Sequence, residues 1–123
     1  MHLERRRKRS NYKALALQYY LASVARRHRV VAMVVADNAG LLVAASMQGP
    51  ESEELAAVAP LLMREDASGQ TIADRHRLPI AIDPIDIDGS ELFICAVGQE
   101  AGCAAGLDQA RGGVERILAV PAI

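Results

Sequence analysis

Aromatic side chains are scarce in this chain, which has three tyrosines, one phenylalanine and no tryptophan among 123 residues. Because 51% of the residues are apolar, the core must be aliphatic, built from Val, Ile, Leu and Ala. The scarcity also argues against single-stranded nucleic-acid binding by base stacking, since that mode needs aromatic platforms. The composition indicates one globular domain, because 123 residues suffice to bury a single core.

Cysteines are also few. Cys95 lies in an apolar, strand-like run and Cys103 at an expected helix start, which is not a disulfide framework, so we expect a reducing, cytoplasmic location. The three histidines, His2, His28 and His76, do not combine with the cysteines in a zinc-like spacing. We therefore expect neither a metal site nor a cofactor.

No uncharged apolar stretch reaches the length of a membrane span, so we expect no transmembrane helix. A signal peptide is an alternative, with Arg5–Arg9 as its basic region, Ala14–Val24 as its apolar region and Ser23-Val24-Ala25 as a passable cleavage site. Because Gln18 and two tyrosines dilute the apolar region, we interpret this segment as the first helix of the domain.

The common catalytic motifs are missing: the chain has no phosphate-binding loop of the Gly-x-x-x-x-Gly-Lys-Ser/Thr type and no Gly-x-Ser-x-Gly elbow. Asp83, Asp86 and Asp88 precede Gly89, but their spacing does not fit a calcium loop, and we interpret them as solvated aspartates. We predict no catalytic residues and a protein that is not an enzyme.

Charge is distributed unevenly. Residues 1–29 carry nine Lys/Arg against one Glu, whereas residues 30–123 carry five Arg against fourteen Asp/Glu. The basic residues Arg5, Arg6, Arg7, Lys8 and Arg9 are consecutive, and we expect residues 1–9 to form a disordered tail preceding a domain over 10–120. Such a tail can contact nucleic-acid phosphates, anionic lipid or an acidic protein surface, or simply remain solvated.

The segment Val30–Ser46 predicts a β-hairpin. Two apolar runs flank Asp37-Asn38-Ala39-Gly40, whose residue types favour a tight turn. Val30–Ala36 is apolar at odd and even positions alike, as is Glu91–Val97, so both are predicted to be central strands buried on two faces. Asp88-Gly89 predicts a second hairpin turn.

Three helices are predicted. The first runs from Ser10 or Asn11 to about Arg27. It has two apolar stripes, which suggest contact with both a sheet and a neighbouring helix: Tyr12, Leu15, Tyr19 and Ala22 in one, and Leu17, Leu21 and Val24 in the other. The second begins at Pro50-Glu51 and should kink or restart at Pro60. The third runs from about Cys103 to Ala119, and its Gly112-Gly113 pair requires close helix packing or a local break.

Two further short strands, Leu78–Ile82 and Ile85–Asp88, are predicted on either side of Asp83-Pro84, and Asp66–Arg77 is interpreted as loop. The resulting element order is α-β-β-α-β-β-β-α. We therefore predict an α/β (α+β) fold, with a five-stranded antiparallel sheet covered by helices on both faces.

This order resembles that of the roadblock/dynein light chain family, a profilin-like architecture. The resemblance rests on the hairpin Val34–Ser46, the Glu-rich helix Glu51–Leu62, the strand Leu92–Val97 and the closing segment Gly113–Ala119. It implies two outer helices on one sheet face and the middle helix on the other. It also implies homodimers, in which third strands and middle helices pair, and a role as scaffold or regulator of Ras-like small GTPases. The bacterial gliding-motility regulator of this type accelerates GTP hydrolysis without catalytic side chains of its own.

We accordingly expect a cytoplasmic, non-catalytic, homodimeric adaptor whose partner is a Ras-like small GTPase or another roadblock-type domain. It is expected to associate through the middle helix, where an apolar face repeats at helical spacing: Leu55, Val58, Ala59 and Leu62. The alternative is that this face covers the chain's own sheet, and an interface would then need Leu61 and Met63 beside it as an exposed apolar surface. Two alternatives stay open. One is a sensor with a ligand pocket between sheet and helices, and the other is a nucleic-acid or anionic-surface binder acting through the basic tail.

Overall fold

The computed structural model describes residues 2–64 and 79–119, and for residues 2–11 the backbone alone. In chain order the elements are α1 (His2–His28), β1 (Ala32–Asp37), β2 (Leu42–Ala45), α2 (Pro50–Arg64), β3 (Ile80–Ile87), β4 (Ser90–Val97) and α4 (Glu100–Ala119). The described chain is thus a mixed α+β fold with three helices and four strands.

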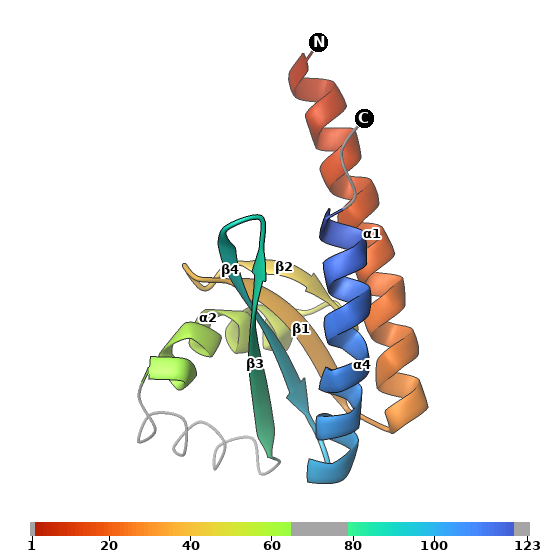
Figure 1. Ribbon diagram of the computed structural model, residues 1–123, viewed down its shortest axis with the longest axis vertical. Helices are drawn as coiled ribbons and strands as arrows, with labels where there is room; N and C mark the ends of the chain where they lie inside the picture. Colours follow the sequence, from red (N-terminus) through yellow and green to blue (C-terminus); the bar gives the residue numbers. More distant parts are fainter. Residues whose placement is uncertain (1, 65–78, 120–123) are drawn as a thin grey trace.

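The four strands form one antiparallel sheet in the order β2-β1-β4-β3, with α1 and α4 side by side on one face and α2 on the other (Figure 1). Each face has its own apolar core. The core under α1 and α4 includes Leu17, Leu21, Met33, Ile94 and Val114. The core under α2 includes Val34, Ala36, Leu55, Ala59 and Phe93.

The two strands predicted to be central, β1 and β4, are central. They pair with each other over the full length of β1, from Ala32↔Val97 to Asp37↔Leu92. Alternate side chains of each strand enter opposite cores, as Val34 and Val35 do, and both are fully buried. An apolar run without alternation is therefore the correct signature of these strands.

Both predicted hairpin turns are confirmed. At the first, a carboxylate oxygen of Asp37 accepts hydrogen bonds from the backbone N–H groups of Ala39 and Leu41, each at 2.9 Å, and Gly40 has a φ of 84°. At the second, Asp88 and Gly89 have φ values of 51° and 84°, the left-handed pair that a two-residue hairpin loop requires.

The prediction of five strands is wrong for the described residues. The predicted strands at 78–82 and 85–88 are one continuous strand, β3, in which Pro84 pairs with Phe93. Proline is compatible with this position because β3 is an edge strand of the described sheet, so the missing N–H removes no hydrogen bond to β4. Leu78 and the predicted loop Asp66–Arg77 lie outside the described residues.

Helix boundaries also differ from the predictions. The backbone of α1 is helical from His2 instead of Ser10 or Asn11, so residues 2–9, predicted as a disordered tail, continue the helix. Arg and Lys are good helix formers, and a helix already fixed by packing extends at low cost. Helix α2 does not restart at Pro60, and α4 begins at Glu100, one turn before Cys103.

Close packing of α1 against α4 explains the glycine pair in the last helix. Gly113 is buried, and a Cβ atom there would overlap the ring of Tyr20 on α1. The Tyr20 hydroxyl donates a hydrogen bond of 2.8 Å to the backbone carbonyl of Gln109 on α4. Gly112, in contrast, has open space around it. Only Gly113 is therefore required by the packing.

Candidate association surfaces

Helix α2 carries the four residues predicted to contact a partner, and the structure places them mainly against the chain's own sheet. Leu55 and Ala59 are buried, with 4% and 0% of their surface exposed, and Val58 is partly buried against the same core. Leu62 is half-buried. The stripe therefore covers the sheet, and Leu55 and Ala59 cannot offer a surface to a partner in this fold.

The exposed apolar part of α2 lies beside that stripe, near the C-terminal end of the helix. Leu61 is 50% exposed and Met63 is 42% exposed. These are the two residues whose exposure an interface on α2 would require. Leu61 and Met63 therefore form a candidate association surface on α2. It lies beside the predicted surface on the helix circumference.

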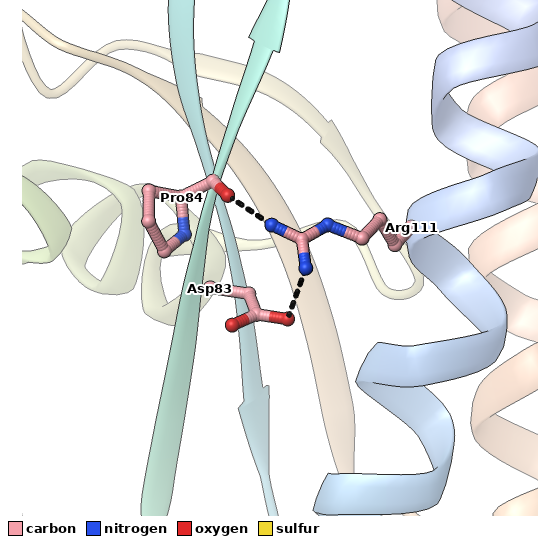
Figure 2. A network of polar contacts seen from close by, with 3 residues as sticks. All are labelled: Asp83, Pro84 and Arg111. Atoms are coloured by element: carbon pink, nitrogen blue, oxygen red, sulfur yellow. Dashed lines mark hydrogen bonds and ion pairs between the residues drawn. The ribbon is translucent and has the colours of Figure 1, made fainter.

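The outer edge of β3 is a second candidate association surface, because a strand of a partner could pair with it. Contacts at the middle of β3 obstruct such pairing. Arg111 of α4 reaches over β3 and donates a hydrogen bond of 2.8 Å to the Pro84 carbonyl (Figure 2). The same guanidinium lies 3.8 Å from a carboxylate oxygen of Asp83. Since Pro84 has no N–H and its carbonyl is occupied, neither of its backbone groups is available to another strand.

Helix α1 has a third exposed apolar surface. Of its two predicted stripes, the one containing Leu17, Leu21 and Val24 is buried. The other stripe contains Tyr12, Leu15 and Tyr19, which are 74%, 45% and 67% exposed. Helix α1 does contact both the sheet and a neighbouring helix, as predicted. Because α4 packs beside Tyr20 and Lys13, however, the second stripe is left exposed.

A cavity of about 480 Å³ opens between the N-terminal end of α2 and the ends of β1 and β4. Its walls are largely apolar and include Val31, Met47, Leu55 and Val97. Ser52 is the most deeply buried polar side chain here, and its hydroxyl donates to the Met47 carbonyl at 2.7 Å. The amide of Gln48 donates to the Gln18 side chain. Both groups therefore already have a hydrogen-bond partner within the chain.

Both cysteines are buried free thiols. Burial raises the pKa of the Cys95 thiol to about 12 and also raises the pKa of Cys103. A raised pKa disfavours the thiolate, which is the reactive form. Within the described residues no group of three or more His, Cys, Asp or Glu side chains is placed to hold a metal ion.

The remaining predicted site is the basic run Arg5–Arg9, whose backbone forms part of the first turns of α1. In Figure 1 these turns extend past the end of α4 and beyond the sheet. Among the helices in the described part of the chain, none combines the length and the apolarity needed to cross a membrane.

Comparison with known proteins gives no relative: no family model, no curated protein and no solved structure matches this chain.

Proposed function

We propose that this protein is a non-catalytic, homodimeric adaptor or regulator of a Ras-like small GTPase, of the roadblock type. It acts by binding and positioning the GTPase, with no catalytic side chain or cofactor of its own. It works in the cytoplasm.

The observation that carries this proposal is the distribution of helices over the sheet. The first and last helices lie together on one face, and the middle helix lies alone on the other (Figure 1). That is the arrangement implied by the resemblance to the roadblock family, and it follows here from two independent cores on the two faces of β1 and β4. The resemblance concerns architecture, so the partner class is an inference from it.

The dimer is proposed to form through the exposed side of α2. Leu61 and Met63 are large apolar side chains left half-exposed on a helix whose other face is already buried. Pairing of the β3 edges is disfavoured, because Pro84 and Arg111 interrupt the edge at its middle. The proposed dimer is therefore held by helix contacts more than by a continuous sheet.

A ligand sensor remains the second candidate, and the cavity beside the N-terminal end of α2 is the observation in its favour. Its volume is within the range of small-molecule sites. The ligand sensor is the weaker candidate because the nearby Ser52 hydroxyl and Gln48 amide already have hydrogen-bond partners within the chain.

The direct test is single-turnover GTP hydrolysis by a co-encoded Ras-like GTPase, titrated with this protein. Binding is measured in parallel by calorimetry. We expect saturable binding, with a change in hydrolysis rate if the protein is a regulator and none if it is a scaffold. The test variant is Leu61→Ser, which we expect to weaken both effects, and the matched control is Leu15→Ser, which should leave them unchanged. Absence of binding at concentrations where the protein is dimeric would contradict the proposal.

A further inference from the structure

The outward side of α1 carries what we call the α1 stripe: Tyr12, Leu15 and Tyr19. These residues are spaced by three and four positions, so they lie within roughly 60° of the helix circumference. The buried residues Leu17 and Leu21 lie about half a turn away. The α1 stripe therefore points directly away from the core, and no other element in residues 12–64 and 79–119 covers it.

Positive charge flanks the α1 stripe at both ends. Five consecutive basic residues occupy positions 5–9, and Arg26, Arg27 and Arg29 follow at the other end. The N-terminal turns of α1 extend beyond the sheet and α4 (Figure 1). The acidic residues are concentrated elsewhere, since residues 30–123 hold fourteen of the fifteen Asp and Glu. The helix thus presents an apolar, aromatic surface between two basic clusters.

We propose that α1 docks on the surface of membranes that contain anionic lipid, lying in the plane of the interface. Tyrosine rings are favoured at the level of the headgroups, and a leucine between them can enter the acyl boundary. Lys and Arg beside such a surface are attracted by the negative potential of the anionic headgroups. This proposal goes beyond GTPase regulation and does not depend on it.

The charge pattern argues against a second copy of the chain as the occupant of the α1 stripe. Because both ends of α1 are basic, a second α1 packed against it in parallel or antiparallel direction would bring cations beside cations. A nucleic acid would neutralise the basic clusters but would leave Leu15 without an apolar environment. An anionic lipid surface satisfies the charges and the apolar side chains together.

The test is co-flotation of the full-length chain with vesicles of phosphatidylcholine and phosphatidylserine, against vesicles of phosphatidylcholine alone. We expect binding to the anionic vesicles only, and weaker binding as salt is raised, because exposed charges are screened. Replacing three basic residues, as in Arg6→Gln/Arg7→Gln/Lys8→Gln, should weaken binding at least about tenfold. Leu15→Ser/Tyr19→Ser should weaken it by a similar factor without any change in charge.

The control is Leu41→Ser, which alters an exposed leucine between β1 and β2 and should bind vesicles as the wild type does. Circular dichroism checks that each variant is folded, which we expect for Leu15→Ser/Tyr19→Ser because both side chains are exposed. Three results would overturn the proposal: no binding to anionic vesicles, binding that the Leu15→Ser/Tyr19→Ser variant retains in full, or tighter binding to a DNA duplex than to the vesicles. Failure of the GTPase titration would leave this test unaffected.

Discussion

The ring of Tyr20 on α1 lies against the Cα of Gly113 on α4, where even a methyl group would overlap it. The hydroxyl of the same ring donates to the carbonyl of Gln109, one turn earlier on α4. This contact fixes how closely the two helices approach, and with it the shape of the face that carries the α1 stripe.

The neighbouring glycines of α4 should respond in opposite directions to alanine. Gly113→Ala forces the Tyr20 ring out of its position and breaks its hydrogen bond, so we expect a loss of about 1–3 kcal/mol in the free energy of unfolding. Gly112→Ala meets open space within a helix and should gain about 1 kcal/mol. Urea unfolding of both variants measures the difference. Equal effects would show that the close contact at Tyr20 does not constrain the helices.

The edge of β3 should resist pairing because of Pro84 and Arg111. Arg111→Ala alone is expected to cost at most about 1 kcal/mol, since its ion pair with Asp83 is partly exposed. Pro84→Thr/Arg111→Ala restores a backbone N–H and frees the carbonyl, and we expect it to form species larger than the wild type does. Sedimentation velocity compares the two variants. If the double variant sediments as the wild type does, Pro84 and Arg111 do not protect the edge.

Stability should fall at high pH because of the buried Cys95 thiol. Below pH 9.0, the ordinary value, this thiol keeps its proton in both states. Above it the unfolded chain releases the proton, while the folded chain holds it up to about pH 12. The free energy of unfolding should therefore decrease across this range, and less steeply for Cys95→Ala than for the wild type. Identical slopes would contradict a protonated, buried thiol.

The two central strands and the hairpin turns were predictable because the residues that specify them are neighbours in the sequence. Runs such as Val30–Ala36 are apolar at every position, and their shortness and high valine content favour a strand buried on both faces over a buried helix. Asp37 and Gly40 specify their turn through side-chain hydrogen bonding and a positive φ. These signals require no knowledge of the rest of the chain.

The predictions that differ from the structure depend on contacts between residues far apart in the sequence. Pro84 indicates a strand break in sequence, but on an edge strand its missing N–H affects no hydrogen bond to β4. The spacing of Leu55 and Ala59 indicates an apolar face without saying whether the sheet or a partner covers it. In the same way, the α1 stripe is visible in sequence, but its exposure depends on where α4 packs.

The most direct test of the proposed adaptor is its molar mass in solution, measured by multi-angle light scattering over a dilution series. The chain has a mass of 13.2 kDa, and we expect a species of twice that mass. Leu61→Ser should shift it toward the monomer without unfolding it, whereas Leu15→Ser should not. A wild-type protein that remains monomeric at every concentration, or a dimer that Leu61→Ser leaves intact, would contradict association through α2.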